Sequence, residues 1–361
     1  MSNALYSFKL VDKLGPGTIQ TVKGQSALHG AFLWCQIDVV VELKQNWRAR
    51  DDAAFVEMLN RIRLGKVRKI AIDKHNASDY DVLKTRLLPE IQGRSKDEFE
   101  SFKDAPIIVT RKYLRDAINQ SKACAFATQT GQEHHVYHAK DRISGNSLAI
   151  DQQERLWKMD TTHTNDSPGI LPLISGMPIM VTENAATSCK IVNGSRGILK
   201  SIVYEIDEAS NRFPVYALVE IKESTLHVAG LDDGIIPIFP ITSSFTFCMG
   251  EKTVIIRRTQ LPILPGWAFT DYKVQGSELS KVIVDLTNAR TLQSIYVMLS
   301  CASKLRNVAI LRWFSSRTLH ADLQGDARNE LQQLVNIATS TRTKYLQEHT
   351  SGMSPTLMPV S

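Results

Sequence analysis

The feature that most constrains the fold is a long block of short β-type segments, between residues 176 and 260, that contains no helical pattern of useful length. Asn, Gly, Asp and Pro residues separate its apolar runs, which is typical of a small antiparallel barrel or sandwich. On both sides of this block, apolar strand patterns alternate with amphipathic helix patterns. This alternation favours an α/β unit with a mostly parallel sheet. The sequence therefore predicts an α/β domain that an all-β segment interrupts.

Individual elements can be placed from the same patterns. Residues 38–43 (DVVVEL) are typical of a short buried strand. Asp51-Asp52 can cap a helix that carries Phe55 to Ile62 at helical spacing, and Gly65 stands where the helix should end. The other expected strands are 106–110, 178–183, 197–206, 214–222, 236–247, 281–286 and 308–313, and the other expected helices are 111–127, 292–299 and 319–346.

Composition excludes several classes of protein. The 361 residues carry 43 Lys+Arg and 37 Asp+Glu, a net charge of 43 − 37 = +6, and 43% are hydrophobic, as in a globular chain with ample core. Prolines break the longest apolar stretches, 169–181 and 234–241, so no membrane span is expected. Five scattered cysteines without a C-x-x-C pair, and no secretory signal pattern, indicate an intracellular protein. The positive excess permits a polyanionic partner.

Two basic stretches could bind phosphate, although each has a plainer structural explanation. Arg48 follows the predicted strand 38–43, where α/β sheets place ligands, and a guanidinium there can bind a nucleotide phosphate. On the local pattern alone, a solvated basic turn before a helix is the favoured interpretation. Asn193-Gly194 marks a tight turn between β runs, with backbone amides and Arg196 available to a phosphodiester backbone. The default interpretation of that turn is structural.

The polar stretch 266–279 lies between a β segment and the strand 281–286. Thr270, Lys273 and Gln275 are phosphate and base-edge donors, and Gly276 can bring backbone amides close to a phosphate. An ordinary loop is the alternative.

Other patterns are not expected to carry chemistry. His134, His135 and His138 lie in a loop that enters a strand, so no metal site is predicted there. The apolar run 202–208 ends in Asp-Glu but lies inside the β block, where it is expected to be a hairpin end. No G-x-x-x-x-G-K-[ST] phosphate loop occurs in the sequence.

Taken in order, these stretches resemble the C-terminal half of the petite-integration-frequency DNA helicases. That family belongs to the 5′-to-3′ RecD-like branch of superfamily 1, which includes helicases carried by Helitron-type transposons. Residues 41–65 are similar to the region of the fourth helicase signature, 268–276 (AFTDYKVQG) to the fifth, and 296–300 (YVMLS) to the sixth. Residues 106–119 resemble the strand and helix that follow the fourth signature. Residues 176–184 and 192–197 resemble the entry into a small SH3-like barrel.

The resemblance covers residues 24–315 and implies a second RecA-like domain split by that barrel. The implied organisation is a leading segment from the end of the first RecA-like domain (1–37), RecA-like domain 2 (38–185 and 263–316), the SH3-like insertion (186–262) and a helical tail (317–361).

The resemblance also implies roles for matching residues. Arg48 would reach the γ-phosphate of ATP bound in the cleft between the two RecA-like domains. Gln275 and Gly276 would line that cleft and couple it to the bound DNA strand. Thr270 and Lys273 would touch single-stranded DNA. The full set of implied DNA contacts is Thr110, Arg111, Asn193, Arg196, Thr270 and Lys273, and the implied ATP contacts are Arg48, Gln275, Gly276 and Glu278.

Several positions depart from the family pattern. Cys301 replaces the arginine that ends the sixth signature, and a neutral thiol cannot stabilise transition-state charge. In the fifth signature, Tyr272 replaces His and Val274 replaces Ser. Just after it, Glu278 replaces a hydroxyl residue. A carboxylate there would repel a nearby phosphate, but a glutamate also occurs near this place in the Rep-like branch, so both interpretations of Glu278 stay open.

The resemblance implies ATP and Mg²⁺ as cofactors, but the phosphate loop and the magnesium motif belong to the family's first domain. The chain is therefore expected to bind single-stranded DNA and to form half of an ATP cleft, without hydrolysing ATP alone. Possible partners are that first domain or a full-length helicase in trans, and the implied location is nuclear in a eukaryote. DNA repair, recombination and telomere maintenance are the processes the family implies. The alternatives are a non-catalytic nucleic-acid- or protein-binding module and an inactive transposon-derived remnant.

Overall fold

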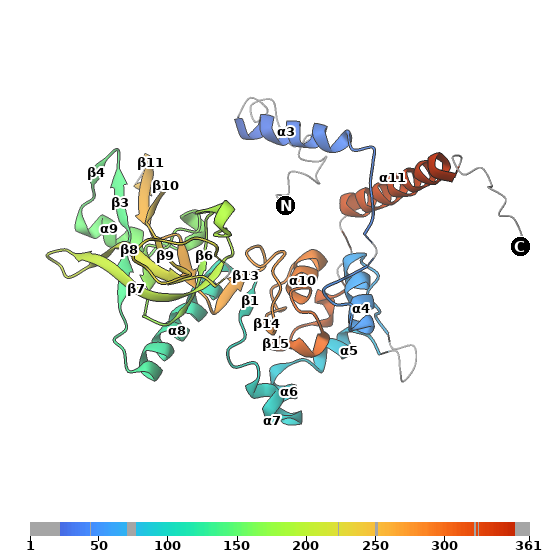
Figure 1. Cartoon of the computed structure of the whole chain (residues 1–361), viewed down its shortest axis with the longest axis horizontal. Coiled ribbons are helices and arrows are strands. Elements are labelled where there is room, and N and C mark those ends of the chain that lie inside the picture. Colours follow the sequence, from blue (N-terminus) through green and yellow to red (C-terminus); the bar gives the residue numbers. More distant parts are fainter. Residues whose placement is uncertain are drawn as a thin grey trace, which may run out of the picture. The chain divides into compact units, whose positions relative to one another are not determined.

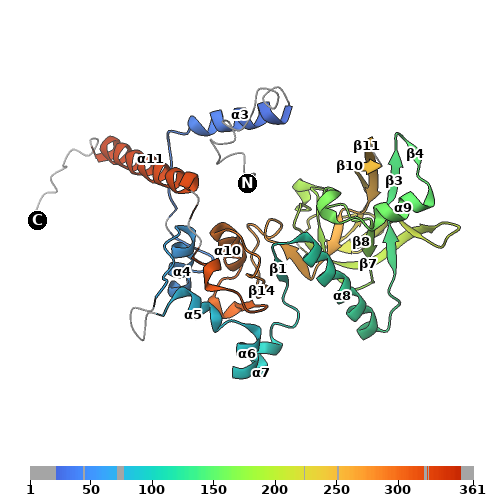
Figure 2. The ribbon, with the colours of Figure 1, turned by 180° about the vertical axis from the view of Figure 1, so that it is seen from behind.

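The computed structural model describes residues 22–43, 45–70, 77–222, 224–249, 252–320, 323 and 325–350. The chain divides into two compact units, one formed by Met1–Val67 with His320–Ser361 and the other by Arg68–Leu319 (Figures 1 and 2). Residues 1–21 of the predicted leading segment and 351–361 of the predicted tail lie outside the described residues.

The first unit contains three described helices, α3 (Val22–Cys35), α4 (Ala53–Arg63) and α11 (Gly325–Thr350). The Asp52 side chain accepts a hydrogen bond from the Phe55 N–H at 3.1 Å and so caps α4. Gly65 follows with a φ of +67°, a left-handed conformation that suits glycine at a helix end. The predicted helix and both of its ends are confirmed.

The strand predicted at 38–43 is wrong. These residues form an extended connection outside any strand, and Val39, Val41 and Leu43 are 64%, 75% and 89% exposed. An apolar run becomes a strand only where a neighbouring strand can pair with it. The described part of the first unit holds helices and loops but no such partner.

The second unit contains a four-stranded parallel sheet in the order β13-β1-β14-β15 (Figure 1). Its strands are β1 (Ile107–Val109), β13 (Ala268–Thr270), β14 (Val282–Val284) and β15 (Val308–Ile310). Every residue of these strands is buried, as a parallel sheet requires. The predicted α/β class with a parallel sheet is confirmed.

Helices of this unit begin and end where local chemistry dictates. Thr291 caps α10 by accepting from the Ser294 N–H at 3.2 Å, and Gly131 ends α8 in the left-handed conformation. Asn119 of α8 holds both backbone groups of Ala268, accepting from its N–H at 2.8 Å and donating to its carbonyl at 3.0 Å. The helices are α5 (Asp79–Lys84), α6 (Leu88–Arg94), α7 (Lys96–Glu100), α8 (Lys112–Thr130), α9 (Ile150–Trp157) and α10 (Leu292–Leu299).

Between β1 and β13 the chain forms two further sheets, largely antiparallel. One has the order β12-β6-β7-β8-β2-β5 with β9 added on β8, and the other has the order β10-β11-β3-β4. The interruption of the parallel sheet by β structure agrees with the sequence pattern. Their strands are β2 (Val136–His138), β3 (Lys140–Ile143), β4 (Asn146–Ser147), β5 (Ile170–Pro172), β6 (Pro178–Val181), β7 (Arg196–Ile206), β8 (Arg212–Glu220), β9 (Ile235–Ile238), β10 (Ile241–Met249), β11 (Lys252–Gln260) and β12 (Ile263–Pro265).

A buried ion pair ties the smaller β sheet together. Arg258 of β11 faces Asp141 of β3, with Nε–Oδ1 and Nη2–Oδ2 distances of 2.7 and 2.8 Å. The same guanidinium donates to the carbonyls of Leu156 and Ser167 at 2.7 and 3.0 Å. Both side chains of the ion pair are fully buried, so this arginine joins β3, β11, α9 and the loop after α9.

Among the described helices, none combines the length and the apolar character needed to cross a membrane.

Candidate nucleic-acid interface

The site is built on the carboxyl ends of β1 and β13, which are neighbours in the parallel sheet. Val109 pairs with Thr270, and the Asp271 N–H continues the ladder by donating to the Val109 carbonyl at 3.2 Å. Thr110 and Thr270 therefore lie at the same edge of the sheet. Thr270 is buried, whereas Thr110 is half-buried and donates to the Asn288 carbonyl at 3.3 Å.

Helix α8 begins directly at this edge. Arg111 is its N-cap residue and forms no side-chain capping bond, and the first turn contains no acidic residue. The first N–H groups of a helix have no intrahelical partner and carry a partial positive charge. Arg111, Lys112 and these amides make the start of α8 electropositive.

The loop after β13 brings Lys273 to the same place. Its Nζ donates to the Thr182 carbonyl at 3.3 Å and to Asn193 Oδ1 at 3.2 Å. Burial lowers the pKa of Lys273, an effect that the nearby carboxylates of Asp166 and Glu183 oppose. Lys273 thus links the parallel sheet to the turn at Asn193 in the β insertion.

Arg196 contributes from the beginning of β7. Its Cζ lies 4.9 Å from the centre of the Phe269 ring, and Phe269 is the central residue of β13. A planar guanidinium stacks well on an aromatic face. Through these contacts the structure brings the six predicted DNA contacts into one region, although they come from separate parts of the sequence.

A network of charged groups lies next to these residues. Arg115 of α8 is fully buried and binds Asp116 Oδ1, Asp166 Oδ1 and Thr161 Oγ1 at 2.7, 2.8 and 2.9 Å. The other oxygen of Asp166 lies 3.3 Å from Lys112 Nζ. Arg115 therefore fixes the carboxylate of Asp166 beside the electropositive start of α8.

Sequence reasoning missed Lys112, Arg115 and Asp166. A signal existed for Lys112, because it follows Arg111 at the start of a helix that was predicted correctly. Asp166 gave no signal, since it is 54 positions from Lys112 in sequence and only the fold makes them neighbours.

The predicted ATP contacts are divided between the two units. Gln275, Gly276 and Glu278 are exposed in the loop between β13 and β14, where Gly276 has a φ of +85°. Arg48 belongs to the first unit, beside Trp47 and Arg50. Their assembly into one cleft stays a prediction.

Cys301 does not take the position of a phosphate ligand. Its side chain is buried, and Sγ lies 3.2 Å from the Val297 carbonyl oxygen and 3.5 Å from the Val274 carbonyl oxygen, so its single S–H can donate to either. Val274, another departure from the family pattern, is also buried. The buried Val274 side chain and the Cys301 thiol therefore hold the loop that follows β13 in place.

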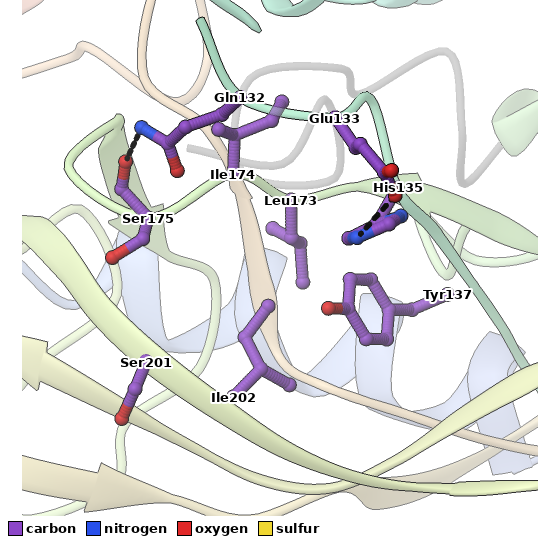
Figure 3. A pocket seen from close by; sticks show the side chains of 9 residues that line it. All are labelled: Gln132, Glu133, His135, Tyr137, Leu173, Ile174, Ser175, Ser201 and Ile202. Atoms are coloured by element: carbon purple, nitrogen blue, oxygen red, sulfur yellow. Dashed lines mark hydrogen bonds and ion pairs between the residues drawn. The ribbon is translucent and has the colours of Figure 1, made fainter. Parts of the chain in front are cut away.

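A separate pocket of about 280 Å³ opens in the β insertion (Figure 3). Leu173, Ile174 and Ile202 give it an apolar lining, and the Tyr137 ring points into it. Burial raises the pKa of the Tyr137 hydroxyl to about 12, and the neighbouring Tyr204 adds to that effect. None of the predicted site residues lines this pocket.

The three histidines of the sequence motif belong to the β insertion, where the His138 ring lies 4.2 Å from the Trp157 ring. Burial lowers the pKa of His138, which favours its neutral form. Within the described ranges, no three His, Cys, Asp or Glu residues are grouped so that they could hold a metal ion.

No protein-family model matches the chain. Two curated relatives are DNA helicases. The ATP-dependent DNA helicase PIF5 of Trypanosoma brucei brucei is 37% identical over 79 residues, which are 22% of this chain and 8% of that protein. The ATP-dependent DNA helicase PIF1 of Xenopus laevis is 23% identical over 276 residues, which are 73% of this chain and 34% of that protein. The chain thus spans about a third of the Xenopus protein.

Solved structures show the same similarity in fold. The crystal structure of Pif1 helicase from Candida albicans superposes with a TM-score of 0.53 at 20% identity, covering 81% of this chain and 60% of that chain. Pif1 helicase from Bacteroides, in complex with ADP-AlF3 and ssDNA, gives a TM-score of 0.52 at 19% identity and covers 81% of this chain and 56% of that chain. The motif-based resemblance is confirmed: this chain is similar to the Pif1 helicases over part of their length.

Proposed function

We propose that this chain is the single-stranded-DNA-binding portion of a 5′-to-3′ helicase of the Pif1 type. The observation that carries the proposal is the gathering of Thr110, Arg111, Lys112, Lys273 and Asn193 around the start of α8. Hydroxyl, ammonium and backbone N–H donors at a helix N-terminus suit phosphate oxygens. The Bacteroides relative, whose structure contains ssDNA, supports this choice of ligand.

In this proposal the phosphates of the single-stranded DNA contact the start of α8, Lys112 and Lys273. Within the described part of the chain, Lys273 uses two of its three ammonium N–H groups on Thr182 and Asn193, which leaves one for a phosphate oxygen. Those two bonds hold the ammonium in place before any ligand arrives, so less side-chain entropy is lost on binding. Arg196 and Thr270 would extend the same surface.

We propose that this chain supplies one side of an ATP-binding cleft. Arg48, Gln275, Gly276 and Glu278 would face ATP and Mg²⁺ that a first RecA-like domain, or a full-length helicase in trans, holds by its phosphate loop. The ADP-AlF3 in the Bacteroides structure supports a nucleotide as ligand of the whole assembly. We also propose that an SH3-like barrel interrupts one RecA-like domain; its predicted bounds, 186–262, are narrower than the strands β2–β12 (136–265) that pair in the two inserted sheets. A nuclear location in a eukaryote completes the proposal.

Equilibrium binding to a fluorescein-labelled oligodeoxythymidylate, followed by fluorescence anisotropy, tests the proposed function. Saturable binding at low salt is expected, weakening steeply as salt rises, because phosphate contacts release counterions. An unlabelled duplex of equal length serves as competitor. Absence of saturable binding at low salt would refute the proposal.

The exposed Tyr272 gives a prediction about base stacking. Its side chain is 75% exposed and adjoins Lys273, so a base next to the bound phosphate can stack on the ring. Base–aromatic stacking contributes about 1–3 kcal/mol, so Tyr272→Ala is expected to weaken oligodeoxythymidylate binding about 5- to 150-fold. Tyr272→Phe should bind like the original chain in the same anisotropy assay. Equal affinity of the alanine and phenylalanine variants would exclude stacking on Tyr272.

Cys301→Arg is expected to destabilise the fold without producing ATP hydrolysis. Residue 301 is buried and lies within electrostatic reach of Arg196, so a larger, positively charged guanidinium there should lower the free energy of unfolding in urea by about 2–4 kcal/mol. Cys301→Ser, whose hydroxyl can donate to the same carbonyls, is the control.

A phosphate-release assay with ATP, Mg²⁺ and oligodeoxythymidylate should show no turnover for the original chain, Cys301→Arg or Cys301→Ser. Turnover by Cys301→Arg would mean that the nucleotide site is complete in this chain.

A further inference from the structure

A simple phosphate-binding site needs positive charges, but the start of α8 also carries carboxylates next to its cations. Arg111, Lys112, Arg115 and Lys273 supply four positive charges, and Asp116, Asp166 and Glu183 supply three negative ones. Asp116 already binds Arg115 through Nε at 2.7 Å. Asp166 is therefore a second carboxylate, placed where the proposed ligand is itself an anion.

Asp166 touches its two cations in different ways. Arg115 is fully buried and binds Oδ1 at 2.8 Å, so this contact anchors the carboxylate. Lys112 lies 3.3 Å from Oδ2 and is 32% exposed, so its ammonium can turn to another acceptor in solvent. The carboxylate thus stays in place while the lysine can exchange partners.

The backbone also fixes the position of Asp166. Asn165 and Asp166 have φ values of +52° and +65°, a left-handed conformation that is uncommon outside glycine. The Asp166 N–H donates to the Thr161 carbonyl at 3.0 Å, and Thr164 Oγ1 donates to the Ser167 carbonyl at 2.6 Å. The backbone conformation and hydrogen bonds of this loop therefore hold the Asp166 carboxylate beside Lys112.

We propose that Asp166 is a built-in counter-ion that competes with nucleic-acid phosphate for Lys112 and so limits the affinity of the site. A carboxylate and a phosphate offer the same kind of charge-assisted bond to an ammonium group. A bound phosphate must take Lys112 from Asp166 and must also approach a fixed negative charge. This inference rests on the proposed DNA-binding function and adds a means of limiting it.

Asp166→Asn tests the proposal with little change of shape. The amide oxygen can still accept from Arg115, and asparagine tolerates the left-handed backbone. Removal of the competing charge is expected to tighten oligodeoxythymidylate binding about fivefold at low salt. Binding should also depend more steeply on salt, because an unpaired Lys112 holds more counterions before the strand arrives. Asp166→Gly, which also suits the positive φ, should change affinity and salt dependence in the same direction.

Two controls separate this effect from a general gain of positive charge. Glu100→Gln removes an exposed carboxylate at the end of α7 and should leave affinity within about 1.5-fold, because separated surface charges are screened. In a Lys112→Gln background, Asp166→Asn should lose most of its effect, since coupled residues are not additive.

The outcomes distinguish this inference from the function on which it rests. Tighter binding and a steeper salt dependence for both Asp166 variants support it. Equal or weaker binding by variants that unfold in urea like the original chain would overturn it, even though the original chain binds DNA. No binding by the original chain would instead remove the proposed function and this inference together.

Discussion

Replacement of Arg258 by methionine is expected to lower the free energy of unfolding by about 3–5 kcal/mol. The substitution leaves the buried Asp141 carboxylate without its cation and removes the guanidinium hydrogen bonds to the Leu156 and Ser167 carbonyls. Burying an unpaired charge costs far more than a lost contact at the surface. Urea denaturation followed by circular dichroism measures the loss.

The neighbouring residue provides a matched control. Arg257 precedes Arg258 on β11 but is exposed, so Arg257→Met should change stability by no more than about 0.5 kcal/mol. The double variant Asp141→Asn, Arg258→Met leaves no buried charge and should be about 1–2 kcal/mol more stable than Arg258→Met alone. Equal effects at 257 and 258 would mean that the buried pair does not hold the smaller sheet together.

Local patterns identified the parts of the fold that local chemistry decides. The strands of the parallel sheet are continuous apolar runs because both faces are covered. Helix α4 was predicted with both of its ends because Asp52 and Gly65 act within one turn of it. The fold class follows from these elements, since a β-rich block between α/β segments has few possible arrangements.

Other elements depend on contacts that are distant in sequence. Strand β11 carries Lys252, Arg257 and Arg258, and its buried arginine is tolerated only because Asp141, 117 positions earlier, faces it. Residues 38–43 were predicted to be a strand because they have the composition of one. They form no strand, because the described part of their unit contains no strand with which they can pair.

In the candidate site, too, some residues could be chosen from the sequence, whereas others depend on contacts between distant parts of the chain. Thr110 and Thr270 were chosen from the family's motifs, and the structure places them at one edge because β1 and β13 are neighbouring parallel strands. Lys273, Asn193 and Arg196 were chosen from motifs, and the structure brings them to that edge. The pairing of Asp166 with Lys112 could not be predicted, because a left-handed loop residue sets it.

Replacing both Lys112 and Lys273 by glutamine is expected to weaken oligodeoxythymidylate binding about 10- to 100-fold at low salt. Each substitution removes one charge-assisted contact to phosphate, and such contacts contribute about 1.5–3 kcal/mol when well formed but less where water screens them. Fluorescence anisotropy of the labelled strand measures the change.

The control removes two exposed lysines from other parts of the same unit. Lys96→Gln with Lys252→Gln lowers the net charge equally and should change affinity by less than about twofold, because screening weakens distant charges. A similar loss in both double variants would mean that net charge, and not this site, binds the strand.

The most direct test of the central claim is the slope of log K against log salt concentration for oligodeoxythymidylate binding. The claim predicts a steep slope for the original chain. For the Lys112→Gln, Lys273→Gln variant the slope should be smaller by about 1.4, at about 0.7 per phosphate contact for two lost contacts. An unchanged slope in the folded variant would contradict the claim that the strand's phosphates bind at the start of α8.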